Sequence, residues 1–411
     1  MMQNDVIVLS SKTKYEEQPF EVIERKGIGH PDTLADALGE CLSVAYSKFT
    51  KKRYGAVLHH NFDKVGIMGG KSRVTFGGGE MLQPIRVLLN GRASGKFGDE
   101  KIQLKQMLID TCLKFFKERF NMLDVNKDIR IIYEVSSGSS PGGVEEKESD
   151  RHYWFEPRSL EDLPELKKLV CNDTSMGCAY APFSPTESLV LGIEKHLNSN
   201  EYKKDKPWLG SDIKIMAQRY ASDVYITMCV PQISNYVLSN EEYKRNLNLI
   251  REDVYQFCRQ IHPQLNLHLN INTRDDEEKG EFYLTYTGSS MESGDEGFVG
   301  RGNRISGIIT PLRPYTMEGI SGKNPVYHTG KIYCVAAYEI AWAIYNELGI
   351  GTEIYLIGQS GQLLIDPWKT IVDVKTDQVF DRNRVEEIVQ KTLKSIPEFT
   401  NKILSDKYVL S

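Results

Sequence analysis

The spacing of apolar residues along the chain predicts several amphipathic helices. After Pro31, apolar side chains recur from Leu34 to Phe49 at the interval that places them on one helix face. Apolar residues repeat in a similar way over 100–123 and 330–348, and a further helix is expected over 383–395. Helices with one apolar stripe are expected to bury that stripe against a core.

Start signals mark two further helices. The run Ser184-Pro185-Thr186-Glu187 has the form of a capping box, with a proline at the first helical position. Ser239 and Glu242 repeat the spacing of a capping box before a helical segment that ends near residue 262. Both segments are therefore predicted to begin directly after these serines.

Segments with one apolar face lie between the predicted helices. Over 265–272, leucine and isoleucine alternate with asparagine and histidine, which is the pattern of a strand with one buried face. Strands are also expected over 128–135, 212–220, 223–230, 281–288 and 352–359. One-sided strands favour antiparallel sheets, so the fold class predicted is α+β.

A coarse pattern recurs three times along the chain. A long helix leads within a few residues to a strand, at 100–123 and 128, at 239–262 and 265, and at 330–348 and 352. The recurrence suggests three similar α+β units, although no repeat of individual residues is visible. We expect these units at about 1–135, 136–275 and 276–411, with boundaries that are discontinuous.

One stretch has the composition of a loop. Residues 136–150 read SSGSSPGGVEEKESD, which is rich in serine, glycine and acidic residues and has no apolar period. This stretch is interpreted either as a linker or as a mobile loop that covers a site.

Composition and charge narrow the class of protein. The chain has 411 residues, of which 40% are hydrophobic and 26% charged, an ordinary balance for a soluble globular protein. Its net charge of −5 argues against a general nucleic-acid binder, so no nucleic-acid partner is expected. The seven cysteines form no C-x-x-C pair, so neither a disulfide framework nor a zinc site is indicated.

No membrane segment is expected. The longest apolar stretch, 333–345, contains Glu339 and is too short to span a bilayer. The N-terminal residues lack the basic and apolar pattern of a signal peptide. The expected location is cytoplasmic.

The first candidate site is KGIGHPDTLAD at 26–36, where a glycine-rich turn enters a helix. Pro31 suits the first helical position, and the free N–H groups of a helix N-terminus favour an anion such as phosphate. His30 would donate to that phosphate, and Asp32 would hold a hard cation such as Mg²⁺. Taken alone, a turn with a helix cap is the simpler interpretation.

The second candidate is TGSSMESGDEGFVGRGNR at 287–304. Five glycines are interspersed there with acidic residues and two arginines, Arg301 and Arg304. Such a loop brings N–H groups close to a phosphate, and a guanidinium binds phosphate with two parallel hydrogen bonds. Asp295 and its neighbouring glutamate would bind a metal or a ribose; a long surface turn is the alternative.

The third candidate is EGISGKNPVYHTGK at 318–331. It lacks the first glycine and the final Ser or Thr of a P-loop, so it is not one. Lys323, His328 and Lys331 still supply positive charge for phosphates, although a solvated lysine is the simpler interpretation of each. Together with Asp32 and Asp295, the basic and glycine-bearing loops imply a polyphosphate–metal ligand and favour a nucleotide enzyme over a scaffold.

Taken together, these motifs resemble the S-adenosylmethionine synthetase (methionine adenosyltransferase) family, in particular its archaeal-type branch. The matching stretches follow the family order across nearly the whole chain. They are ERKGIGHPDT at 24–33, LHHNFDKV at 58–65, FGGGEMLQPIRVLLNGRA at 76–93, NDTSMGCAYAPFSPTE at 172–187, INTRDD at 271–276, GDEGFVGRGNRISGIITPLRP at 294–314 and GKNPVYHTGKIY at 322–333.

The resemblance implies an activity, a fold and an assembly. Members of the family make S-adenosylmethionine from ATP and L-methionine: the sulfur attacks C5′ of the ribose and expels triphosphate, which is then cut to pyrophosphate and phosphate. They require Mg²⁺ and are commonly stimulated by K⁺. Their fold has three α+β domains in a pseudo-threefold arrangement, built from interleaved segments with mainly antiparallel sheets. The resemblance further implies a homodimer or a dimer of dimers, with active sites at the interface.

The resemblance also implies roles for individual residues. His30 would be the catalytic histidine at the C5′–O5′ end of the triphosphate, and Arg301 and Lys323 would grip the triphosphate. Asp295 would hold the ribose or the methionine. Further implied contacts are Arg304, His328, Lys331 and, more weakly, Arg219 with phosphate, Asp173 with the methionine ammonium, and Asp32 and Asp63 with metal ions.

The chain departs from the family pattern at several positions. Thr33 stands where bacterial members have lysine, which itself favours the archaeal-type branch. Ser137 stands where a glutamine is usual in the loop, Ala179 replaces a common glycine, and the lysine expected a few residues after Arg219 has no clear match. These departures keep open a catalytically weak paralogue that binds ATP or S-adenosylmethionine; an ordinary kinase is disfavoured because no P-loop or kinase signature is present.

Overall fold

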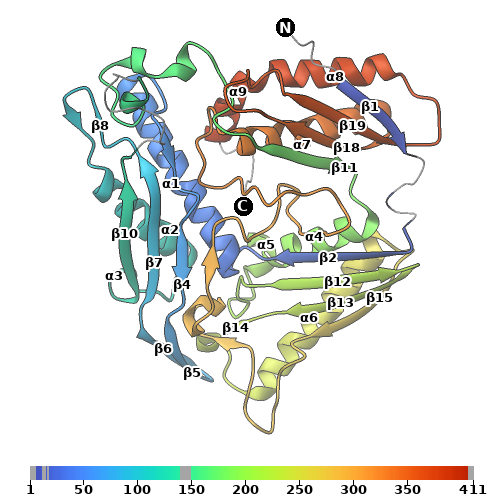
Figure 1. The fold of residues 1–411 in the computed structure, drawn as a ribbon. Helices are drawn as coiled ribbons and strands as arrows, with labels where there is room; N and C mark the ends of the chain where they lie inside the picture. Colours follow the sequence, from blue (N-terminus) through green and yellow to red (C-terminus); the bar gives the residue numbers. More distant parts are fainter. Residues whose placement is uncertain (1–5, 12–14, 16–17, 139–149, 406–411) are drawn as a thin grey trace.

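Mixed α and β structure runs through the described part of the chain. The structure, a computed structural model, describes residues 6–11, 15, 18–138 and 150–405 (Figure 1). The α-helices in these residues are α1 Pro31–Tyr54, α2 Leu104–Arg119, α3 Val125–Asp128, α4 Pro185–Leu197, α5 Asn200–Lys203, α6 Asn240–Ile261, α7 Thr329–Leu348, α8 Arg382–Lys394 and α9 Ile396–Leu404. The predicted α+β class is confirmed.

Three sheets, each with a main path of four strands, form the frame of the molecule. The first sheet has the order β10 Ile129–Ser136, β7 Ile85–Ala93, β4 Gly66–Met68 and β17 Gly297–Phe298, with β3 His60–Asn61 also on β7. The second has β15 Asn266–Ile271, β13 Asp223–Cys229, β12 Lys214–Tyr220 and β2 Phe20–Lys26. The third has β1 Val6–Ser11, β19 Lys369–Lys375, β18 Gly351–Ile357 and β11 Met176–Ala181.

The remaining strands form two-stranded ribbons. They pair β5 Lys71–Thr75 with β6 Gly78–Gln83, β8 Lys96–Phe97 with β9 Glu100–Lys101, and β14 Gln232–Ile233 with β16 Leu284–Thr285. The predicted strand at 281–288 is thus reduced to the two residues of β16, because its neighbours on either side turn through a loop that lines a cavity described below.

The three sheets share one pairing pattern. In each, the first strand of the order given above runs parallel to the second, and the other two pairings are antiparallel. In Figure 1 the first sheet lies at the left, the second at the lower right and the third at the upper right. The sheets are mainly antiparallel, as predicted from the one-sided strands.

The chain passes between the sheets in a cyclic order. Strand β11 of the third sheet leads to α4, which packs on the second sheet, and β2 of the second sheet leads to α1, which packs on the first sheet. The next helix after β17 of the first sheet is α7, which packs on the third sheet. Each sheet therefore takes its last strand from the segment that introduces the following unit.

This interleaving places segments that are far apart in sequence side by side. Strand β1 pairs with β19 across more than 350 residues, and β2 pairs with β12. The ranges 1–135, 136–275 and 276–411 stay a prediction for domain limits, since all three sheets draw strands from more than one of them. Residues 139–149 of the candidate loop 136–150 lie outside the described residues.

A separate hydrophobic core accompanies each sheet. Leu38, Val87 and Phe116 belong to the core of the first sheet, which fills the space between that sheet and helices α1 and α2. Ile215 and Val254 lie in the core between the second sheet and α6, and a third core joins α7, α8 and α9 to the third sheet. The predicted apolar helix faces are thus largely the buried faces, but Phe49, the last residue of the stripe predicted for α1, is 39% exposed.

The predicted helix starts are confirmed in atomic detail. The Ser184 hydroxyl accepts from the Glu187 N–H at 3.1 Å while the Glu187 carboxylate accepts from the Ser184 N–H at 2.7 Å, completing the capping box of α4. The Ser239 hydroxyl accepts from the Glu242 N–H at 3.3 Å at the start of α6. Among the described helices, none combines the length and apolar character needed to cross a membrane.

Candidate active site

The turn before α1 is held against the segment that precedes β12. The Gly27 N–H donates to the Ile213 carbonyl at 2.9 Å, and the Gly29 N–H donates to the Ser211 carbonyl at 3.0 Å. A Cβ atom at Gly29 would lie 2.2 Å from the Ser211 hydroxyl, so only glycine permits this approach. The two glycines therefore bring His30 beside Asp212.

His30 caps the N-terminus of α1 with its ring. The Asp32 N–H donates to His30 Nδ1 at 3.1 Å, so a neutral ring carries its proton on Nε2. Burial, partly opposed by Asp212, lowers the pKa of His30 and favours this neutral form. The arrangement leaves one ring N–H as a hydrogen-bond donor for a ligand.

His30 opens onto a cavity of about 400 Å³. Asp295, predicted from the glycine-rich loop, lines the same cavity, so the structure brings these two residues together. The other lining residues are Asp212, Lys214, Cys229, Asn272, Thr273, Arg274, Asp275, Glu281, Phe282, Tyr283 and Ser290. The cavity offers both acidic and basic groups beside an aromatic wall.

Asp212 is the buried acid of this cavity. Its Oδ2 accepts from the Ser290 hydroxyl at 2.6 Å, the Ser290 N–H at 2.9 Å and the Tyr283 hydroxyl at 3.2 Å. Burial raises the pKa of Asp212, opposed by the nearby His30 ring. The Ser290 hydroxyl also lies 3.0 Å from Asp295 Oδ2, which links the two acids through one side chain.

Asp32 joins the glycine-rich loop to the first turn of α1. Its Oδ1 accepts from the Phe298 N–H at 3.1 Å and lies 3.7 Å from Arg301 Nε, and its Oδ2 accepts from Lys26 Nζ at 2.9 Å. The Arg301 side chain is 70% exposed, so its guanidinium is accessible to an anion. The predicted grouping of Asp32 with Arg301 is thus present.

One turn further along α1, Asp36 fixes the same loop. Its carboxylate accepts from the Gly300 N–H at 2.8 Å and from the Gly302 N–H at 3.1 Å, on the two sides of Arg301. Burial raises the pKa of Asp36 to about 6, against the lowering effect of these N–H donors.

Lys323 belongs to a second group of predicted residues. Its buried ammonium forms an ion pair with Glu318, and Asp63, itself paired with Lys64 at 2.8 Å, lies close enough to influence its ionisation. Burial lowers the pKa of Lys323 to about 8, with Asp63 as the opposing charge.

His328 and Lys331, which follow Lys323 along the chain, are also buried. Lys331 Nζ donates to both carboxylate oxygens of Glu40, at 2.7 and 2.6 Å. His328 lines a different cavity, of about 230 Å³, and its Nδ1 has no partner among the described residues. Burial holds the pKa of His328 well below its usual value. Glu40 and Asp32 are eight residues apart on α1, which separates the two groups by about 12 Å along the helix axis.

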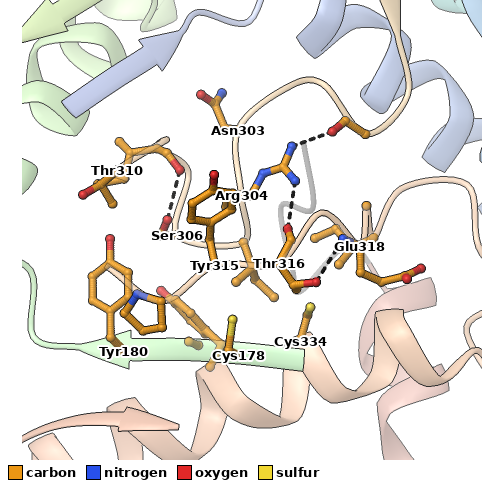
Figure 2. A pocket seen from close by; sticks show the side chains of 18 of the residues that line it. Cys178, Tyr180, Asn303, Arg304, Ser306, Thr310, Tyr315, Thr316, Glu318 and Cys334 are labelled. Atoms are coloured by element: carbon orange, nitrogen blue, oxygen red, sulfur yellow. Dashed lines mark hydrogen bonds between the residues drawn. The ribbon is translucent and has the colours of Figure 1, made fainter. Parts of the chain in front are cut away.

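Of the eleven predicted site residues, His30 and Asp295 line the cavity at His30, and the other nine do not. Three of those nine, Arg304, Asp173 and Arg219, have the following partners. Arg304 donates to the Thr316 carbonyl at 3.2 Å (Figure 2). It also donates to the carbonyls of Gly300 and Gly302, at 2.6 and 2.9 Å. Asp173 is exposed and accepts from the Thr174 N–H at 2.7 Å.

The third of them, Arg219, is buried on β12. It pairs with Glu21 at 3.0 Å and donates to the carbonyls of Ala221 and Gln18 at 2.8 and 3.0 Å. Contacts of Arg219, Arg304 and Asp173 with a substrate stay predictions.

Sequence reasoning missed several residues of the site. Lys214 lines the cavity and lies five positions before Arg219, whereas the expected lysine was sought after that arginine. Asp212, Asp36 and Glu40 were also missed, since each acts on partners that are distant in sequence. The sequence does contain a signal for Asp212 and Lys214. Polar and apolar residues alternate at the start of DIKIMAQRY, which places these two polar side chains at the beginning of a predicted strand.

Metal ligands are sparse in the protein alone. Within the part of the chain that the structure describes, no group of three or more His, Cys, Asp or Glu side chains is arranged to hold a metal ion. The donor set at Asp32 is a single carboxylate, beside the exposed Arg301 and paired with Lys26 Nζ at 2.9 Å, so a metal ion would have to displace Lys26. Mg²⁺ commonly binds one or two carboxylates plus substrate phosphates, so Asp32 fits an ion that is shared with a nucleotide.

Comparisons with known proteins identify the family of the chain. The family described as S-adenosylmethionine synthetase (AdoMet synthetase) matches residues 3–407. The chain is 37% identical to the S-adenosylmethionine synthase of Hyperthermus butylicus, with 100% of both chains covered. It is 37% identical to that of Methanocaldococcus jannaschii, covering 99% of each chain, and 36% identical to a probable S-adenosylmethionine synthase of Aquifex aeolicus, covering 100% of each.

Proposed function

The chain belongs to the S-adenosylmethionine synthetase family, and from this membership we propose how its residues carry out the reaction. It is a methionine adenosyltransferase, which makes S-adenosylmethionine from ATP and L-methionine. The agreement in name among relatives that match the chain over its length favours this activity over a catalytically weak paralogue.

The reaction requires stabilisation of negative charge on the leaving group more than it requires abstraction of a proton. The nucleophile is a neutral thioether sulfur, so no general base is needed at the attacking atom. The sulfur takes C5′ of the ribose, and the bond to the triphosphate oxygen breaks with its electron pair on the leaving group. The triphosphate is then hydrolysed to pyrophosphate and phosphate. Catalysis therefore depends on positioning and on groups that stabilise the departing anion.

The hydrogen bonding of the His30 ring beside the cavity is the observation that carries this proposal. A neutral ring whose Nδ1 is occupied by the Asp32 N–H presents Nε2–H to the cavity. This donor, at the N-terminus of α1, stabilises negative charge that develops on the leaving oxygen at C5′. Asp295, on the same cavity, accepts from the ribose hydroxyls or from the methionine ammonium.

Arg301 and Lys323 are proposed to hold the triphosphate. Arg301 is accessible, and its guanidinium suits two adjacent phosphate oxygens. Lys323 offers a buried cation once its pairing with Glu318 opens. A phosphate contact of Lys331, Arg304 or Arg219 requires each to give up the internal bonds described above, whereas His328 has a free ring nitrogen among the described residues.

The family implies a metal-dependent reaction with ATP. We propose that Asp32 holds Mg²⁺ together with phosphate oxygens and that Asp63 contributes to a second cation, with K⁺ as the monovalent ion. Bound divalent ions neutralise the triphosphate as it leaves. Asp173 is proposed to meet the methionine ammonium, as the family resemblance implies, and its exposed carboxylate is accessible to such a cation.

We further propose a homodimer or a dimer of dimers with active sites at the interface, in the cytoplasm. The separation of the His30 and Lys323 groups along α1 motivates this assembly, because a second chain would bring its own Lys323 group to the His30 cavity. Sedimentation of the purified protein tests the assembly; a monomer that is fully active contradicts it.

One incubation tests the activity. The purified chain is mixed with ATP, L-methionine, Mg²⁺ and K⁺, and the products are analysed by mass spectrometry. S-adenosylmethionine together with phosphate and pyrophosphate is the expected result. Formation of ADP would identify a kinase, and bound but unreacted ATP would identify the weak paralogue; omission of methionine is the matched control.

A further inference from the structure

The ammonium of Lys331 is saturated within the protein. The side chain is fully buried, and Nζ donates to Glu40 Oε1 at 2.7 Å, Glu40 Oε2 at 2.6 Å and the Lys323 carbonyl at 3.0 Å. An ammonium has three N–H donors, so these three acceptors use all of them. Lys331 in this arrangement therefore has no donor left for a phosphate oxygen.

Glu40 also contacts the backbone of the Gly322–Lys323 dipeptide, at the end opposite to the Lys323 carbonyl. Its Oε2 also accepts from the Gly322 N–H at 3.0 Å. The ion pair of Glu40 with Lys331 thus fixes the N–H of Gly322 and the carbonyl of Lys323, which are the two ends of that dipeptide. Both charged partners come from helices, α1 and α7, so the clamp is anchored in regular structure.

Further hydrogen bonds hold the Gly322–Lys323 dipeptide in one conformation. The Phe62 N–H donates to the Gly322 carbonyl at 2.8 Å, and the Ser43 hydroxyl donates to the Lys323 carbonyl at 3.1 Å. Gly322 has a φ of +77°, and a Cβ atom there would lie 2.5 Å from the Phe62 carbonyl oxygen. Glycine adopts this conformation readily, whereas any other residue would be strained there.

We infer that Glu40 and Lys331 are positioning residues that set the direction of the Lys323 side chain by clamping its backbone. The inference rests on the proposed function of Lys323 as a triphosphate ligand. A buried ion pair is often no more stabilising than an apolar pair of the same volume, so its presence is better explained by the geometry it imposes. Positional errors of about 1 Å at a catalytic group reduce turnover on the order of a hundred-fold.

A double-mutant cycle tests this inference. Glu40→Leu combined with Lys331→Met replaces the clamp by apolar side chains of similar size. We expect kcat to fall at least ten-fold, while the KM for methionine stays within two-fold and the unfolding midpoint stays within a few degrees. Lys375→Met, which removes a lysine paired with Glu353 and Asp373 in the third sheet, is the matched control and should keep kcat within two-fold.

The decisive measurement adds the clamp replacement to Lys323→Met. If the clamp acts through Lys323, the replacement costs less than two-fold further in that background. An equal cost in both backgrounds would mean a general structural role and overturn the inference. Should the apolar pair fail to fold, Glu40→Gln, which keeps an acceptor for the Gly322 N–H, enters the same cycle with an expected loss of at least three-fold.

The outcomes separate this inference from the proposed function. A Lys323→Met enzyme with a near-normal rate would remove Lys323 from the mechanism, and the clamp argument with it. A Lys323→Met enzyme that is slowed a hundred-fold, together with a clamp variant of unchanged kcat, would overturn the clamp alone.

Discussion

At the scale of single residues, the site depends on which atoms are already bonded inside the protein. His30 uses one ring nitrogen to cap α1 and keeps the other for a ligand. Lys331 has all three of its N–H donors engaged by the protein, and Arg304 donates three hydrogen bonds to backbone carbonyls. A side chain of the right charge in a motif is therefore not sufficient; its free donors decide its role.

Removal of the His30 ring is expected to slow turnover roughly 10²-fold or more, by analogy with the loss of one donor to a developing oxyanion. His30→Ala is compared with wild type by steady-state formation of S-adenosylmethionine. His196→Ala serves as the control. His196, on α4, stacks on Phe257 with 5.0 Å between the ring centroids, and it does not line the cavity. Similar rates for both variants would exclude His30 from the chemistry.

The ionisation of Lys323 gives a pH prediction. Its pKa is lowered to about 8, so the charged form that binds triphosphate is lost as the pH rises through about 8. We expect kcat/KM for ATP, which reports the free enzyme, to fall above this pH. Lys323→Arg should remove the fall, because a guanidinium stays charged throughout the range. A profile that is flat to pH 10 in the wild type would contradict the assignment.

Residues with a local signal were predictable from sequence, and residues that act over long sequence distances were not. His30, Asp32, Asp295 and Arg301 stand in short motifs, and the structure gathers them at one end of α1. The pairing of Lys331 with Glu40 spans 291 residues, and no spacing rule within a single chain indicates it.

At the scale of elements, the sequence predicts where the helices lie, but not which helices occupy equivalent places in the three units. The segment 330–348 was grouped with 100–123 and 239–262 because a strand follows each of them. In the structure, α2 and α6 precede the parallel edge strands β10 and β15, whereas α7 precedes β18, an inner strand. The counterpart of α2 and α6 is α8, whose edge strand β1 lies at the other end of the chain, so order along the sequence concealed it.

The contact of α1 with the glycine-rich loop gives a prediction for Asp36. Asp36→Asn replaces one acceptor oxygen by an NH₂ group that faces an N–H donor, so the loop around Arg301 should loosen and kcat should fall about ten-fold or more. The KM for ATP should rise, since Arg301 is proposed to hold the triphosphate. Steady-state kinetics at pH 7.5 with Asp110→Asn, an exposed position on α2, as the control measures both effects.

The same residue predicts a pH dependence of stability. The folded-state pKa of about 6 lies above the ordinary value of 3.8, so the native state binds a proton more tightly than the unfolded state between these values. The free energy of unfolding should therefore decrease as the pH rises from about 4 to 6, by roughly 3 kcal/mol from this group. Asp36→Asn should remove that part of the slope in denaturant titrations; an unchanged slope would contradict it.

At the scale of the whole molecule, the cyclic exchange of strands joins the three units into one body. The second sheet needs β2, which belongs to the segment before α1, and the third needs both β1 and β11. No sheet along its four-strand path is built from one contiguous third of the chain. The recurring helix–strand pattern predicted three units, and the family resemblance implied interleaved segments. The identity of the exchanged strands depends on long-range pairing that local patterns do not encode.

This architecture predicts a single unfolding transition. Calorimetry of the ligand-free protein should give one peak whose van't Hoff and calorimetric enthalpies agree per cooperative unit, because loss of any exchanged strand disrupts two units at once. Residues 1–135 expressed alone should lack a cooperative transition, since β17 of the first sheet is then absent. Separate peaks for separate thirds of the chain would show that the units are independent.

The pairing of β1 with β19 has a consequence for biosynthesis. Strand β1 is synthesised more than 350 residues before its partner, so it can pair only when residues 369–375 have left the ribosome. Until then the nascent chain carries an unpaired strand with Val6 and Val8, which pack into the core of the third sheet once it forms, uncovered. An unpaired strand of this kind is prone to aggregation. Completion of the third sheet thus waits for the synthesis of all the residues between β1 and β19, and that delay sets how long the newborn enzyme is vulnerable to aggregation.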